Sequence, residues 1–268
     1  MSAMRSWWKS IWPPLGAVVL LLVIWQLATS LFHIEAWILP SPALIGHEAW
    51  SEKDRLGLHT WATLKLTLSG FSIGVAVGLL VAGVLHYTPF LRSALYPLLI
   101  LSQNIPTIAL GPLLVIWFGF GILSKLIVII LVCFFPVTIA ALSGLATTDR
   151  TMLNYMQMIG ASKSQIFWKL ELPFSLPSIF SGVKIAATYS VMGAIIAEWI
   201  SSSEGIGYYM MLQKSAFRTD HMFLAILVVV AISLLLFMII NLIEKWSIRW
   251  HHPASMRSGK GGSKDVDQ

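Results

Sequence analysis

The sequence predicts an all-α membrane protein with about six transmembrane helices. Of its 268 residues, 57% are apolar and 11% are charged, whereas soluble domains contain about 45–50% and about 25% respectively. The apolar residues gather in runs of about 20, the length that crosses roughly 30 Å of hydrocarbon. The six runs are residues 15–32, 64–86, 92–117, 122–146, 175–199 and 222–245.

One membrane domain accounts for nearly the whole chain. We expect a cytoplasmic N-terminus over residues 1–14, a transmembrane domain over residues 15–250 and a flexible, basic cytoplasmic tail over residues 251–268. The first run follows Arg5 and Lys9, but it is long for a secretory signal and lacks a small-residue cleavage pattern. We therefore interpret it as a retained helix.

The distribution of basic residues predicts the orientation in the membrane. With the N-terminus inside, eleven Lys and Arg residues fall on the cytoplasmic side and six on the outside, as the positive-inside rule requires. Both termini are then cytoplasmic, and so is the polar stretch 147–173. The net charge of +6 reflects this asymmetry, so it does not indicate a nucleic-acid partner. The apolar runs make the lipid bilayer the expected surroundings of the chain.

The second run contains small residues at a spacing of four. Gly70, Gly74 and Gly78 lie on one helix face, where missing side chains let another helix approach closely. The pattern predicts tight packing, either within the chain or at a subunit interface.

The third run is interrupted by polar residues and prolines. Gln103, Asn104, Pro106 and Thr107 lie where the helix would cross the membrane interior. Polar groups at that depth must face protein or water, and broken helices often line a transport path. A translocation path and a kink satisfied by neighbouring helices both remain open.

The fifth run is similar in carrying polar residues within an apolar helix. Tyr189, Ser190 and Met192 lie near its middle, and Glu198 lies near its outer end. An acid within a membrane segment indicates function, so we add these four residues to the candidate path. A carboxylate at the membrane interface is the alternative for Glu198. The outer Gly205-x-Gly207 pair that follows predicts a tight turn.

The polar stretch 147–173 reads as an amphipathic helix, a Gly-Ala-Ser break at 160–162, a second short helix and a Leu-Pro stop at 172–173. Ser162 can cap the second helix. A helix held along the membrane in this way either docks a partner or lies on lipid, and the pattern alone does not choose between them.

Several kinds of chemistry are missing from the sequence. There is no GxxxxGK[ST] phosphate loop, no HExxH metal pattern and no GxSxG nucleophile. We expect neither catalysis nor a metal site in this chain. The single cysteine, Cys133, cannot form an intrachain disulfide, and we interpret it as a packing residue.

At this point the residues resemble a known family. Gly160, nine intervening residues and then Leu170-Glu171-Leu172-Pro173 are similar to the EAA loop of binding-protein-dependent ABC importer permeases. The resemblance includes IPTIALGPLLVIWFGFG (105–121) and EGIGYYM, and extends over nearly all of the chain after about residue 55. It implies a six-helix subunit of the type I importer fold in a bacterial inner membrane.

The resemblance also implies partners and a division of labour. Two permease copies, most simply a homodimer, pair with two ABC ATPase subunits and receive solute from an extracytoplasmic binding protein. ATP and magnesium bind to the ATPase, so no cofactor is expected in this chain. The short helix around Gly160 would be the coupling helix that docks on the ATPase.

The coupling loop carries over residue by residue, with one departure. Asn154, Tyr155 and Met156 occupy the places of the motif's Glu-Ala-Ala, so Asn154 can supply a hydrogen bond there but no charge. The positions that match the motif or adjoin its glycine are Gly160, Ala161, Ser162, Leu172 and Pro173.

Within the family, the chain resembles the nitrate, sulfonate and taurine branch. Asn-x-Met, VCFFPV (132–137) and KIAATYSVMGAIIAEW (184–199) are most similar to permeases for pyrimidine precursors of thiamine. Aliphatic sulfonates, taurine, nitrate and riboflavin are the alternative solutes. An ion-coupled secondary transporter is a more distant alternative, because the sequence shows no inverted repeat and few membrane acids.

Overall fold

The computed structural model describes residues 2–248, with side chains from Trp12 onwards, and all described elements are helices. The basic tail expected over residues 251–268 lies outside this range, as do the side chains of most of the expected N-terminal segment. In chain order the helices are α1 (Ser2–Leu31), α2 (Pro42–Ser51), α3 (Lys53–Tyr87), α4 (Pro89–Ser102), α5 (Thr107–Phe118), α6 (Ile122–Ala146), α7 (Arg150–Met158), α8 (Lys163–Ile166), the π-helical η1 (Phe167–Glu171), α9 (Leu172–Ser201), α10 (Ile206–Ser215) and α11 (Thr219–Ser247).

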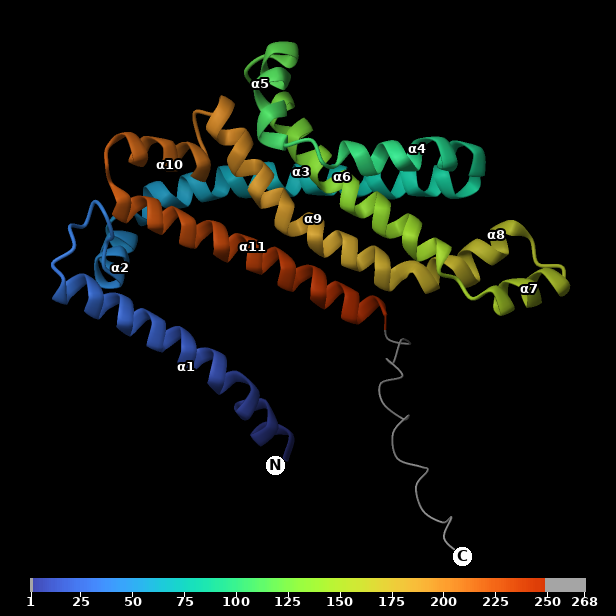
Figure 1. The fold of residues 1–268 in the computed structure, drawn as a ribbon, viewed down its shortest axis with the longest axis horizontal. Coiled ribbons are helices and arrows are strands. Elements are labelled where there is room, and N and C mark those ends of the chain that lie inside the picture. The colour runs from blue at the N-terminus through green and yellow to red at the C-terminus, as the bar shows by residue number, and fades with distance from the viewer. Residues whose placement is uncertain (1, 249–268) are drawn as a thin grey trace, which may run out of the picture.

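Among residues 2–248, five helical segments are long and apolar enough to cross a membrane. They lie in α1, α3, α6, the continuous helix formed by α8, η1 and α9, and α11. Figure 1 shows α7 and α8 at one end of the long helices and α2 and α10 at the other. We call these the loop end and the α10 end.

The third apolar run does not form the single transmembrane helix that its length predicted. It divides into α4 and α5, whose axes meet at 102°, and a sixth crossing exists only if this bent pair spans the membrane. Pro106 explains the break, because its ring excludes the preceding residue from the helical conformation. At the end of α4, the Asn104 amide donates to the carbonyl of Ile100 at 2.8 Å and the Ser102 hydroxyl donates to that of Leu98 at 2.7 Å. The polar side chains of Ser102 and Asn104 therefore donate hydrogen bonds to backbone carbonyls in the last turn of α4.

The core is centred on α3, α6 and α9, with α6 in extensive contact with both others, and α11 adds Ile232, Leu236 and Ile240 to it. The glycine stripe of α3 faces α6: a β-carbon at Gly74 would lie 2.7 Å from the β-carbon of Cys133. On the other side, Gly182 of α9 approaches the backbone of α6 as closely. The stripe thus packs within the chain. We call α3, α6 and α9 the three-helix frame.

Two other helices attach to this frame in different ways. In α11, Glu244 accepts a 2.7 Å bond from Lys184 of α9, and both side chains are largely buried. The membrane-length part of α1 is almost entirely exposed. Its contacts with the rest include the Trp25 ring against Phe223 and the Gln26 amide oxygen, which accepts from the Ala43 N–H at 3.1 Å. Exposed apolar side chains along α1 suit a hydrocarbon environment.

The expected helix stop at Leu172-Pro173 is wrong. The helix runs without a break from Lys163 to Ser201, passing through η1 just before the proline. A proline lacks an N–H and collides with the carbonyl four residues earlier in a regular α-helix. The wider π turn, in which the N–H of Leu172 reaches the carbonyl of Phe167, accommodates the proline instead of ending the helix.

Candidate functional site

The 147–173 loop forms two helical pieces joined by a tight turn. Asp149 caps α7 by accepting from the Thr151 N–H at 2.8 Å. The helix ends at Met158, and Gly160 follows its C-cap with a φ of +76°, the left-handed conformation that glycine adopts just after helix ends. The Ala161 N–H then donates to the carbonyl of Met156 at 3.0 Å. The predicted break is therefore a defined turn that fixes α7 relative to α8.

The second piece begins with the predicted cap. The Ser162 hydroxyl accepts from the Gln165 N–H, and the Gln165 side chain accepts from the Ser162 N–H at 2.8 Å. This reciprocal capping box satisfies two backbone donors that the helix cannot. Since α8 continues through η1 into α9, a force on this turn acts directly on the end of a membrane-length helix.

Apolar side chains of the 147–173 loop are exposed. Met158 is 85% exposed and Tyr155 60% exposed, and Asn154 lies on the same open surface of α7. Further exposed large side chains on the loop are Met152, Ile159 and Trp168. Exposed apolar surface next to polar groups is typical of an interaction site, which fits docking or contact with lipid.

A second contact holds the loop to the end of α3. Nε2 of His86 lies 2.9 Å from Oε2 of Glu171, and both side chains are about 15% exposed. The Phe167 ring packs against His86 and Tyr87 at centroid distances of 5.9 and 5.4 Å. The loop is therefore connected to two helices of the three-helix frame. It continues directly into α9, and the His86–Glu171 contact joins it to α3.

At the α10 end, the carboxylate of Glu198 is buried inside the bundle. Only 2% of the residue is exposed. One carboxylate oxygen accepts from the Thr63 hydroxyl at 2.8 Å, and the other accepts from the Gly207 N–H at 2.7 Å. Buried carboxylates are retained when hydrogen bonds satisfy them, and here the bonds join α3, α9 and α10.

The segment before α10 is fixed by the same residues. The Ile206 N–H donates to the Thr63 hydroxyl at 2.7 Å, and the Gly205 N–H donates to Nδ1 of His59 at 3.1 Å. Gly205 has a φ of +105°, which agrees with the tight turn predicted from the glycine pair. Thr63 therefore serves as donor to Glu198 and acceptor for Ile206.

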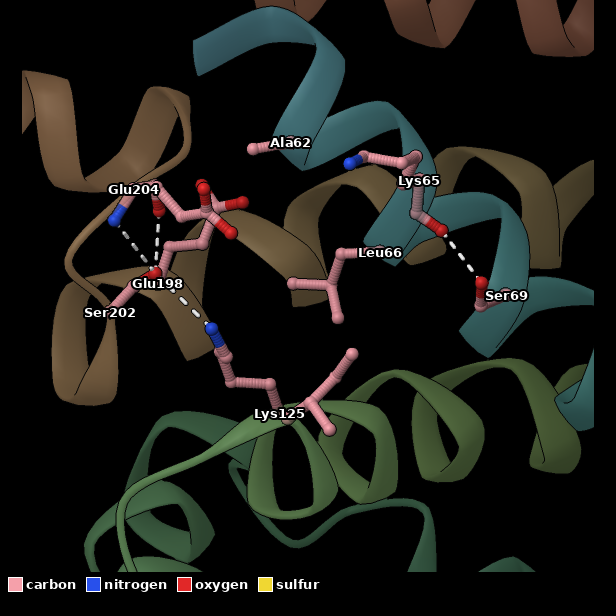
Figure 2. Close-up of a pocket in the computed structure, with 9 residues that line it drawn as sticks. Ala62, Lys65, Leu66, Ser69, Lys125, Glu198, Ser202 and Glu204 are labelled. Atoms are coloured by element: carbon pink, nitrogen blue, oxygen red, sulfur yellow. Dashed lines mark hydrogen bonds between the residues drawn. The ribbon is translucent and has the colours of Figure 1, made fainter. Parts of the chain in front are cut away.

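A cavity of about 270 Å³ adjoins this network, between all three helices of the frame. Figure 2 shows four charged residues around this cavity: Lys65 on α3, Lys125 on α6, Glu198 on α9 and Glu204 shortly after the end of α9. Lys125 donates to the Ser202 hydroxyl at 3.3 Å. The lining carries both basic and acidic side chains, and the cavity has room for a small polar solute or water. Because its walls belong to three different helices, a relative movement of these helices would change its shape.

The predicted path residues do not form one group. Gln103, Asn104 and Pro106 are exposed at the bend between α4 and α5, where Thr107 is half-buried. Tyr189 and Met192 lie on the exposed face of α9. Ser190 and Glu198 point instead into the bundle, where the Ser190 hydroxyl donates to the carbonyl of Ala187 at 2.8 Å.

The sequence did not indicate one side-chain cluster, because Glu48 lies far along the chain from the adjacent Asp220 and His221. Ligand atoms of Glu48, Asp220 and His221 all lie within 4.8 Å of one another, in a grouping that suits a metal ion. However, Nη2 of Arg218 lies 3.0 Å from Asp220 and 3.6 Å from Glu48, so a cation of the chain already neutralises it. The hydrogen bond to His221, followed by that to Ser51, lowers the pKa of Glu48. The cluster is an ion-pair network that ties α2 to α11.

Comparison with known proteins identifies the family. Residues 74–250 match the profile of the inner membrane component of binding-protein-dependent transport systems. This chain is an ABC importer permease. A probable ABC transporter permease protein of Haemophilus influenzae is 37% identical over 85% of this chain and 93% of its own length. A formylaminopyrimidine transport permease of Halalkalibacterium halodurans (87% and 93% covered) and a riboflavin transport permease of Chloroflexus aurantiacus (92% and 94% covered) are each 33% identical.

Membership in the family settles the kind of molecule. An ABC importer permease is a multi-pass membrane component that carries solute and does no catalysis itself. The family works with an ABC ATPase and a solute-binding protein. The matched region contains most of the three-helix frame and the whole 147–173 loop. The residues that identify the family are therefore largely those whose contacts are described above.

Proposed function

We propose that α7 and α8 of the permease form the coupling segment that docks on an ABC ATPase. The exposed apolar side chains of α7 support this role, because the tight turn at Gly160 presents them away from the bundle. The continuity of α8 with α9 supports it too, since docking there acts on a membrane-length helix. A ligand-driven change requires different contacts in two states, which an ATPase supplies as it closes on ATP and reopens.

The proposal extends to the whole assembly, and membership in the importer family supports it. Two ATPase subunits bind ATP and magnesium, and this chain needs no cofactor of its own. Two identical permease copies form the membrane pathway. The loop end is cytoplasmic, together with both termini, and the α10 end receives solute from an extracytoplasmic binding protein.

The solute is a small polar molecule. The sequence resemblance and the 33% identity to a formylaminopyrimidine permease favour a pyrimidine precursor of thiamine. The similar identity to a riboflavin permease keeps riboflavin as an alternative, beside aliphatic sulfonates, taurine and nitrate. Ligand binding by the secreted partner protein decides among them.

Site-specific crosslinking tests the docking surface. Met158→Cys places a thiol on the most exposed part of α7, while the native Cys133 is fully buried and does not compete. We expect this variant to crosslink to the ATPase in membranes that contain the whole transporter. Leu212→Cys on α10, which is also exposed, is the matched control and should not crosslink.

The result that would overturn the proposal is equally direct. Equal crosslinking from both positions, or none from Met158→Cys when the ATPase still co-purifies, would place the ATPase elsewhere on the permease.

A further inference from the structure

The first and last helices of the three-helix frame are joined by polar contacts at both ends. At the loop end, His86 of α3 lies 2.9 Å from Glu171, directly before α9. At the α10 end, the Thr63 hydroxyl of α3 donates to Glu198 of α9 at 2.8 Å. The two contact points on α3 lie about 35 Å apart along the axis, at a rise of about 1.5 Å per residue. The contacts thus bracket most of the membrane-crossing length.

Between these ends the packing is close. Gly70 and Gly193 approach Ile129 from α3 and α9, and Gly78 and Gly182 both approach Val137. The missing side chains bring the helices near each other, and side chains of α6 such as Ile129 fill the notches that the glycines leave. Within the frame the Thr138 hydroxyl of α6 donates to the carbonyl of Gly78 at 3.2 Å, so α3 is also held to α6. The polar contacts at the two ends are the ones that join α3 and α9 directly to each other.

From this geometry we propose that His86 and Glu171 are positioning residues that carry the movement of the 147–173 loop into α3. The proposal rests on the proposed docking of that loop on the ATPase. A push on α8 moves α9 through the continuous helix. Through the His86–Glu171 pair, the same push moves α3 in step, so that Thr63, the Ile206 segment and the cavity at the α10 end shift together.

The Lys184–Glu244 ion pair provides the matched control. Lys184 and Glu244 lie 2.7 Å apart with side chains 22% and 19% exposed, close to the values for the His86–Glu171 pair. This pair joins α9 to α11 and does not involve α3. Its loss should cost similar local stability without uncoupling the two ends of α3.

The test measures movement at the cavity while changing the opposite end of the molecule. Ser69→Cys places one reactive thiol on the cavity lining, in a chain whose only native cysteine is fully buried. The complete transporter, with its ATPase, is placed in nanodiscs. The rate of labelling by a polar maleimide is then compared without nucleotide and with ATP and vanadate.

We expect nucleotide to change this rate by roughly fivefold or more, the lower end for coupled sites. In Glu171→Ala the change should fall below about twofold, while Glu244→Ala should keep it. The double variant His86→Glu with Glu171→Lys should restore the change, because a hydrogen-bonding donor and a carboxylate again face each other across the same contact. ATPase association should stay intact in all of these variants.

Three results would overturn the proposed positioning role. They are an undiminished nucleotide effect in Glu171→Ala, an equal loss in Glu244→Ala, or no nucleotide effect in the unmodified pair. Failure of the ATPase to associate through the loop at all would instead overturn the proposed docking, which the crosslinking experiment detects separately.

Discussion

The hydroxyl of Thr63 and the carboxylate of Glu198 lie 2.8 Å apart although 135 residues separate them in the chain. Both residues are buried, and the same hydroxyl accepts from the Ile206 N–H at 2.7 Å. A single side chain therefore connects two membrane-length helices and the start of α10. Removing it leaves a buried carboxylate oxygen and a buried N–H each short of one partner.

Thr63→Val tests this connection, since valine has nearly the shape of threonine without its hydroxyl. We expect a loss of stability of about 1–3 kcal/mol, the usual cost of leaving buried polar groups unsatisfied. Hydrogen exchange should rise most at residues 205–207. Thr67→Val, one turn along α3, is the control, because the Thr67 hydroxyl is buried without a hydrogen-bond partner in the described structure. Equal destabilisation by both changes would contradict the assignment.

The glycine stripe leads to a prediction about packing. Gly74→Leu should lower the free energy of unfolding of the purified permease by about 1–3 kcal/mol or more, the usual cost of overpacking. The reason is that even a β-carbon there meets the Cys133 side chain and the backbone of α6. Gly83→Ala has open space around it and should stabilise by up to about 1 kcal/mol. A harmless Gly74→Leu would mean that α3 and α6 do not pack as described.

How far the sequence predicted the structure depends on the range of each interaction. The spacing of Gly70, Gly74 and Gly78 predicted close packing, but a spacing within one helix does not say which helix is the partner. The Ser162 cap and the Gly160 break were confirmed because both act within a few residues. His86 and Glu171 are 85 positions apart, and nothing in either neighbourhood indicates the pair.

The prolines also show that local sequence predicts a disturbance of a helix but not the geometry that results. Pro106 was expected to disturb a helix and does break it, yet the 102° bend that follows depends on how α5 packs. Pro173 was expected to end a helix, but the π turn before it accommodates the proline and the helix continues. Burial of Glu198 could not be predicted, since its depth along the run indicated only a shallow position and not which side of α9 faces the bundle.

Gly160 allows backbone conformation to be separated from contact. Its φ is +76° and a β-carbon there would meet nothing within 4 Å, so a substitution is opposed by the left-handed backbone, at about 1–2 kcal/mol, and not by a clash. Gly160→Val should impair uptake and ATPase coupling while membrane insertion stays normal. Gly160→Asn should keep most activity, because asparagine tolerates this conformation. Normal uptake and ATPase association in Gly160→Val would exclude the coupling role.

The ion-pair network of Glu48, Arg218, Asp220 and His221, which ties α2 to α11, predicts a response to acid. Hydrogen bonding from His221 and Ser51 and the nearby charge of Arg218 hold the pKa of Glu48 below its ordinary value of 4.5. A carboxylate whose folded-state pKa is lowered stabilises the fold fully above its unfolded pKa, and this contribution disappears as the pH falls through the folded pKa. The attachment of α2 to α11 should therefore weaken only below about pH 4.5.

Hydrogen exchange in α2, followed from pH 6 to about pH 3.5 with rates corrected for intrinsic pH dependence, measures that attachment across the range where an ordinary carboxylate titrates. Native α2 should be protected at the upper end and lose protection as Glu48 takes up a proton. Glu48→Gln should show weaker protection throughout, with little further change, because its amide keeps hydrogen-bonding capacity but carries no charge for Arg218. The same acid-induced loss in Glu48→Gln as in the native chain would assign the transition to another group in the cluster, of which Asp220, bound to the same guanidinium at 3.0 Å, is the nearest.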